Sequence, residues 1–165
     1  MAMQTGEQSR FTDLLNEPVD HLLSPIKGYQ DKPLISLSEA VKPIEKRFRE
    51  IEDYVFVASE NCKNPAGGLT QDESAAIYLY TMQFDNGPSL DHLLNQSLRA
   101  EEREELKSWF SFLKLFLTAL YKLPSQRETV WRGIRDIDLS SKYKTGTKFV
   151  WWGVSSCTTN IEVIF

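Results

Sequence analysis

The residues best suited to chemistry lie between Val130 and Thr159. One arginine, Arg132, stands between Trp131 and Gly133 in a short run of β-branched and aromatic residues. Burying such an arginine is costly without an anionic partner, and its planar guanidinium suits a phosphate or carboxylate held by two hydrogen bonds. Gly133 would let a ligand or a second backbone come close. This setting points to an anion-binding position, with an exposed arginine on an edge strand as the alternative.

A group of hydroxyl side chains follows the second apolar run of this stretch. The run extends from Phe149 to Trp152, and the hydroxyl residues after it are Ser155, Ser156, Thr158 and Thr159. Aromatic and β-branched residues favour an extended strand, and short hydroxyl side chains at its end can hold a sugar or phosphate edge. The alternative interpretation is a serine-rich turn.

The two motifs together resemble the first two signature elements of the arginine-specific mono-ADP-ribosyltransferases. That family is marked by an Arg, a Ser-x-Ser/Thr strand and a later Glu-x-Glu. Arg132 in VWRGI matches the first element, and Ser156-Cys157-Thr158 in GVSSCTT matches the second. The aromatic lead-in ending at Gly153 also fits. The segment LTQDESAAIYLYT is similar to the helix that precedes the catalytic sheet in this family.

The resemblance implies transfer of ADP-ribose from NAD, or from NADP, to an arginine exposed on an acceptor protein, with release of nicotinamide and no metal. It implies that Arg132 and Gly133 hold the phosphate and adenine-side ribose region. Ser156 would position the nicotinamide ribose and the catalytic glutamate, and Thr158 would brace the strand. These four residues are the predicted NAD-binding residues, and Ser156 is the predicted catalytic residue.

The third signature element does not follow the second in this sequence. Glu162 is the only acidic residue between Thr159 and Phe165, and no Glu-x-Glu occurs there. In the family that glutamate stabilises the oxocarbenium-like transition state beside the ribose. We therefore expect a truncated or degenerate member of the family, inactive or incomplete in this form.

The composition is that of an ordinary globular chain. The 165 residues are 41% hydrophobic and 25% charged, with a formal net charge of −4. An acidic balance argues against nucleic acid as a partner. The sequence has no apolar run of the roughly 18 residues that a membrane helix needs, and no signal peptide is recognisable. We therefore expect a cytoplasmic protein with no membrane contact.

The cysteines and histidines do not form a recognisable metal or disulfide pattern. Cys62 and Cys157 are expected to be reduced thiols, because two cysteines do not make a disulfide framework. His21 and His92 have no cysteine or carboxylate at metal-ligand spacing, so no zinc site is expected.

The elements that must position these residues are helices first and strands afterwards. Residues 1–35 are expected to be extended or irregular. Capping boxes at Ser36–Glu39 and Thr70–Glu73 open helices, and an amphipathic pattern predicts the longest helix over Glu101–Tyr121. Helices over about 36–123 and strands over about 129–159 predict an α+β fold. By resemblance, residues 36–165 would form a helical layer and the first strands of an ADP-ribosyltransferase-type mixed β-sandwich, incomplete at the C-terminus.

Two other functions compete with the transferase. The chain could be a non-catalytic helical protein-interaction module or pseudoenzyme, in which case Arg132→Ala would have no effect on NAD binding. A serine hydrolase using Ser156 is a weaker candidate, because no Gly-x-Ser-x-Gly elbow is present and neither histidine has a triad context. The sequence does not indicate the acceptor protein or the oligomeric state.

Overall fold

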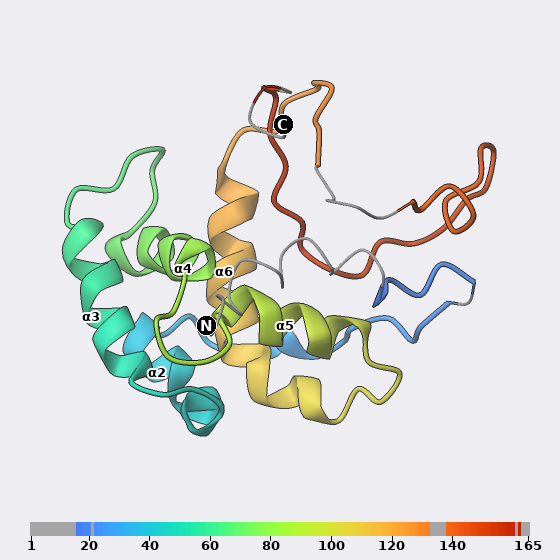
Figure 1. Ribbon diagram of the computed structural model, residues 1–165. Coiled ribbons are helices and arrows are strands. Elements are labelled where there is room, and N and C mark those ends of the chain that lie inside the picture. The colour runs from blue at the N-terminus through green and yellow to red at the C-terminus, as the bar shows by residue number, and fades with distance from the viewer. Residues whose placement is uncertain (1–15, 21, 133–137, 161, 163–165) are drawn as a thin grey trace, which may run out of the picture.

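The computed structural model describes residues 16–20, 22–132, 138–160 and 162. Within them, helices occupy the region from residue 29 to residue 122, and an extended segment follows (Figure 1). The helices are η2 (Tyr29–Asp31), α2 (Leu37–Val41), η3 (Lys42–Arg47), α3 (Ile51–Asn61), α4 (Gln71–Thr81), α5 (Leu90–Arg99), η4 (Glu105–Trp109) and α6 (Phe110–Lys122). Here η denotes a 3₁₀ helix. We call Leu37–Lys122 the helical layer and the described residues 126–132 and 138–160 the C-terminal segment.

Both predicted capping boxes are confirmed. The Ser36 hydroxyl accepts from the Glu39 backbone N–H, and the Glu39 carboxylate accepts from the Ser36 backbone N–H. Thr70 and Glu73 make the same reciprocal pair at the start of α4. Each box satisfies two backbone donors that have no partner within the helix. The local sequence therefore fixes where α2 and α4 begin.

Pro43 shortens the helix that Ser36 begins. Proline lacks the N–H that an α-helix needs and fits best in the first turn. Accordingly α2 ends at Val41, and Pro43 lies in the first turn of η3. The next helix, α3, is separate from η3 and is preceded by Glu50 in a left-handed conformation (φ 57°).

The longest helix begins later than expected. The predicted start at Glu101 is wrong, because α6 begins at Phe110 and the turn before it, η4, is 3₁₀. That tighter turn buries Leu106 and Trp109 against the other helices. The acidic residues at 101, 102, 104 and 105 are exposed to solvent.

The core of the molecule lies within the helical layer. Helix α6 packs against α4 and α2, and α3 packs against α4. Trp109, Phe112 and Phe116 are fully buried, and Phe116 stacks on Tyr80 with ring centroids 4.8 Å apart. Burying each such side chain contributes roughly 1.5–3 kcal/mol. The apolar stripe predicted for this helix is therefore the centre of the core.

The expected α+β fold is wrong for the described residues. Where strands were predicted over about 129–159, the described part contains one isolated antiparallel bridge, between Trp131 and Thr158, and no sheet. Residues 147–157 have no regular secondary structure. β-Branched and aromatic residues fit a pleated surface, but a ladder also needs partner strands, and two strands alone are marginal in water. A mixed β-sandwich is therefore absent from the described part of this chain.

No helix among the described residues is both long and apolar enough to cross a bilayer.

Candidate functional site

The structure brings the two predicted motifs side by side at one point. The Trp131 backbone N–H donates to the Thr158 carbonyl at 2.7 Å, and the Thr158 N–H donates to the Trp131 carbonyl at 2.9 Å. These two hydrogen bonds are an antiparallel pair. In Figure 1 the two segments meet near the end of the chain, beyond the last turn of α6. The Arg132 element and the hydroxyl motif are thus neighbours in space.

The predicted NAD-binding residues differ in their surroundings. Arg132 is half-buried, Ser156 is exposed, and Thr158 is half-buried within the bridge. Gly133 lies outside the described residues. A regular ladder continued from this bridge would place Arg132 opposite Cys157 and turn Ser156 to the other face, because side chains alternate along a strand. In the described residues the pairing stops at the bridge, so this alternation is not imposed.

Two polar side chains of the helical layer hold the segment that leads to Ser156. The Val154 N–H donates to Asn95 Oδ1 at 2.7 Å, and Asn95 Nδ2 donates back to the Val154 carbonyl at 3.0 Å. The Tyr80 hydroxyl donates to the same carbonyl at 2.7 Å. Asn95 and Tyr80 are buried and are themselves joined by a hydrogen bond of 2.9 Å. Asn95 therefore pairs with Val154 much as a neighbouring peptide group would.

A buried ion pair completes this attachment. Glu17 Oε2 lies 2.5 Å from Arg99 Nε, and the two side chains are 0% and 6% exposed. Glu17 Oε1 accepts hydrogen bonds from the backbone N–H groups of Trp152 and Gly153. We call the described residues before Ser36 the N-terminal segment. It thus meets both α5 and the C-terminal segment at one carboxylate, that of Glu17.

Arg103 covers the other side of the same segment. Its guanidinium lies 5.0 Å from the centre of the Trp152 ring, in a cation–π arrangement. The same guanidinium donates to the carbonyls of Ser24 and Leu98, at 3.1 and 2.6 Å. Burial lowers the pKa of Arg103 from its ordinary value. Arg103 thereby ties Trp152 to the end of α5 and to the N-terminal segment.

Aromatic side chains form a second cluster in the C-terminal segment. Tyr143 lies 5.1 Å from Phe149 and 6.1 Å from Trp151, measured between ring centroids. Burial raises the pKa of Tyr143, and the Glu17 carboxylate raises it further, whereas Arg99 and Arg132 act in the opposite direction. Tyr143 is thus within electrostatic reach of both the buried ion pair and Arg132.

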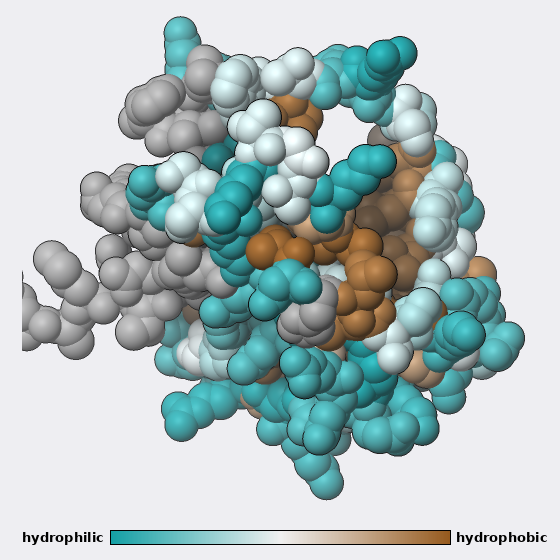
Figure 2. All heavy atoms as spheres, turned by 90° about the vertical axis from the view of Figure 1, so that its right-hand side faces the viewer, coloured by the Kyte–Doolittle hydropathy of each residue, from teal (hydrophilic) through white to brown (hydrophobic). Residues whose placement is uncertain are grey.

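The side of the molecule that carries the C-terminal segment has hydrophobic side chains at its centre, surrounded by hydrophilic ones (Figure 2). Exposed hydrophobic residues of this segment include Val130, Phe149 and Val150. They are distributed along an extended chain and contribute little to the buried core.

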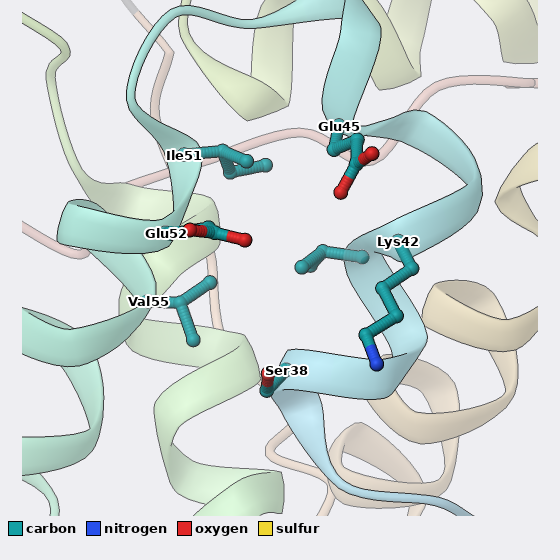
Figure 3. A pocket seen from close by; sticks show the side chains of 7 residues that line it. Ser38, Lys42, Glu45, Ile51, Glu52 and Val55 are labelled. Atoms are coloured by element: carbon teal, nitrogen blue, oxygen red, sulfur yellow. The ribbon is translucent and has the colours of Figure 1, made fainter.

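A hollow of about 280 Å³ lies elsewhere, within the helical layer. Figure 3 shows Glu52 on one side of it and Glu45 and Lys42 on the other. Its remaining lining consists of Ser38, Val41, Ile51 and Val55. Of the predicted NAD-binding residues that the structure describes, Arg132, Ser156 and Thr158, none lines this hollow.

Both cysteines are free thiols, as expected, with Cys62 buried and Cys157 exposed. The part of the chain that the structure describes holds no group of three or more side chains suited to a metal ion.

Sequence reasoning missed the residues that fix the segment before Ser156. Neither Glu17 nor the polar positions of α5 were among the predicted site residues. A signal was nevertheless present in α5. Asp91, Asn95 and Arg99 recur at every fourth position beside the apolar positions 90, 94 and 98, and all three are buried. A polar stripe at helical spacing beside an apolar one indicates side chains that pair within the protein.

Comparison of the chain with models of protein families, with curated proteins and with solved structures gave no match. A functional assignment consequently depends on the two motifs and their surroundings.

Proposed function

We propose that this chain binds NAD through Arg132 and the hydroxyl motif, as the nucleotide-binding part of a mono-ADP-ribosyltransferase acting on protein arginine. The observation that supports the proposal is the antiparallel pair between Trp131 and Thr158, which places the two motifs side by side. A guanidinium beside a row of hydroxyl groups matches the chemistry of a dinucleotide, which presents phosphate oxygens and ribose hydroxyls.

Each residue has a defined part in this proposal. Arg132 offers paired N–H donors to the pyrophosphate, and Ser156, being exposed, offers its hydroxyl to the nicotinamide ribose. Thr158 keeps the two segments together through its backbone. The proposal requires that Arg132 and Ser156 turn toward one cleft. Among the described residues no regular ladder continues from the bridge and turns them to opposite faces.

Transfer of ADP-ribose makes a further demand. The bond between C1′ and nicotinamide breaks with its electrons leaving on nicotinamide, and the acceptor guanidine attacks C1′ and loses a proton. A carboxylate must stabilise the positive charge that develops on the ribose. In the resembled family a Glu-x-Glu supplies it, and that motif does not occur between Thr159 and Phe165. We therefore propose NAD binding, with little or no transfer, as the activity of these 165 residues.

Calorimetric titration of the purified chain with NAD tests this function. We expect saturable binding that Arg132→Ala weakens about tenfold or more, because a charge-assisted pair contributes about 1.5–3 kcal/mol. Arg49→Ala, which removes an exposed arginine of the helical layer, is the matched control and should bind NAD as the unaltered chain does. Absence of binding, or equal weakening by both variants, would refute the assignment. Rapid nicotinamide release with a simple guanidino acceptor would refute the expected lack of transfer.

A second candidate is a non-catalytic protein-interaction module. The hollow that α2 and η3 form with α3 favours it, because three apolar side chains lie there beside two carboxylates and a lysine. Arg132, Ser156 and Thr158 do not line it. This function predicts no saturable binding of NAD and no effect of Arg132→Ala.

A further inference from the structure

We propose that Glu17 is a positioning residue: with Arg99, its carboxylate holds the backbone bend at Gly153 that leads to Ser156. The consequence for NAD depends on the function proposed above, whereas the effect on the conformation of residues 152–154 does not. The N-terminal segment is then a working part of the site, although it is distant from it in sequence.

The burial of Glu17 is the first support. Its side chain is 0% exposed, and its partner Arg99 is 6% exposed. Removing two charges from water costs several kcal/mol for each ion, so a buried pair is weak support for stability alone. A buried ion pair is better explained by a role in holding the chain in one conformation. Here the pair joins a residue of the N-terminal segment to the last residue of α5.

The second support is the pair of backbone hydrogen bonds that the other carboxylate oxygen of Glu17 accepts. Glu17 Oε1 accepts from the backbone N–H of Trp152 and, at 3.4 Å, from that of Gly153. Backbone donors outside helices ordinarily bond to a neighbouring strand, to a turn or to water, and among the described residues no strand pairs with Trp152 or Gly153. Asn95 does the same for the next residue, Val154. Side chains thus accept hydrogen bonds from the backbone N–H groups of three consecutive residues.

Gly153 supplies the third support. A Cβ atom at this position would lie 2.4 Å from Arg99 Nη2 and 2.9 Å from Arg99 Cζ. Only glycine lets the backbone approach the guanidinium this closely. The close contact fixes the backbone over the ion pair, and Ser156 follows only three residues later.

The test combines NAD titration with amide hydrogen exchange, measured residue by residue on the full chain. Glu17→Gln keeps the size of the side chain but removes the charge that pairs with Arg99. We expect exchange at the Trp152 and Gly153 amides to rise about tenfold or more, because each loses a charge-assisted acceptor. The NAD dissociation constant should rise by a similar factor, while exchange within α6 stays unchanged.

Glu73→Gln is the matched control. Glu73 is also a buried carboxylate in an ion pair, with Lys122 at 2.7 Å, but its partners Lys122 and Thr70 both lie in the helical layer. We expect this variant to lose stability without changing exchange at Trp152 or Gly153. It separates a local effect on the segment from a general loss of stability.

The outcomes distinguish the two proposals. If the unaltered chain does not bind NAD, the proposed function fails. Amide hydrogen exchange at Trp152 and Gly153 then still decides whether Glu17 holds the backbone, because that measurement does not involve NAD. If Glu17→Gln leaves that exchange unchanged, or changes it no more than Glu73→Gln does, the positioning role is refuted. Unchanged NAD affinity in Glu17→Gln, with faster exchange, would show that Glu17 holds the segment but does not position the site.

Discussion

The helical layer and the C-terminal segment are held in place by different forces. Every buried hydrophobic residue among the described ones lies between Leu23 and Ala119, and all but Leu23 belong to one continuous core or to α6. The C-terminal segment contributes Val154 to the edge of that core and otherwise depends on hydrogen bonds to a few buried polar side chains. Apolar packing therefore defines the first region, and specific polar contacts define the second.

This difference determines how each region should respond to change. A packed core loses stability in proportion to the volume removed, because its surroundings collapse only in part. A segment held by a few hydrogen bonds can change conformation locally while the core stays folded. The predictions below test this contrast.

The largest effect is expected for Trp109→Ala. Trp109 is 0% exposed and contacts Phe48 and Phe112 edge to face. Removing its ring should cost about 3–5 kcal/mol, measured by chemical denaturation. Trp151→Ala is the matched substitution in the C-terminal segment, where the side chain is 38% exposed, and we expect a cost below about 1 kcal/mol. Equal costs would contradict the contrast between the two regions.

A smaller effect is expected for Gly153→Ala. The new methyl group would meet the Arg99 guanidinium, which the ion pair with Glu17 keeps from moving away. We expect a loss of about 1–3 kcal/mol, typical of overpacking at a closed site. Calorimetric or denaturant-induced unfolding measures it.

A double-mutant cycle with Arg99→Ala tests the cause of that loss. If the clash is with the guanidinium, Gly153→Ala should cost less once Arg99 has been shortened. Additive costs would show that the strain arises elsewhere.

The helical layer was largely predictable because its signals are local. Ser36 and Thr70 each lie three residues before a glutamate, and both capping boxes form as expected. Pro43 marked the point at which α2 gives way to η3. The start of α6 was not predictable in this way, since tertiary packing of Leu106 and Trp109 converts the turn before it to 3₁₀.

The C-terminal segment was not predictable from local preference. Aromatic and β-branched residues indicated strands, but the propensity of a residue for extended backbone does not supply a pairing partner. The antiparallel bridge at Trp131 was consistent with the expected neighbourhood of the two motifs, whereas the sheet was not. Glu17 was missed because its partners lie far away in sequence, at Arg99 and Trp152, and no local pattern encodes such contacts.

Removing the charge of Glu73 should lower the unfolding free energy by about 1–2 kcal/mol. This contribution depends on pH. Burial alone would raise the pKa of this carboxyl, but hydrogen bonds from Lys122 and from the Thr70 backbone outweigh it and lower the pKa below its ordinary value of 4.5. Stability from a carboxyl with a lowered pKa is present above the unfolded-state pKa and is lost as the pH falls through the folded-state pKa. Unfolding free energy should therefore decrease below about pH 4.5.

Glu73→Gln checks this assignment. The variant should be less stable at pH 7 by about 1–2 kcal/mol, because it loses a charge-assisted pair. Its unfolding free energy should also change less between pH 5 and pH 3 than that of the unaltered chain. An unchanged slope would assign the acid sensitivity to other carboxyl groups.

The smallest effect on stability is expected from chemical modification at Cys157. Thiol reactivity offers a second measurement of the difference between the helical layer and the C-terminal segment. Cys157 is exposed in the C-terminal segment, while Cys62 is buried at 6% exposure at the end of α3. A thiol reagent should modify Cys157 while the protein stays folded and should shift the unfolding free energy by less than about 0.5 kcal/mol. Cys62 should react only through opening of the helical layer, at a rate that follows its unfolding equilibrium.

Trp109→Ala should therefore speed modification of Cys62 by a large factor and leave that of Cys157 unchanged, because only the buried thiol depends on the core. Equal acceleration of both thiols would mean that the two regions unfold as one cooperative unit.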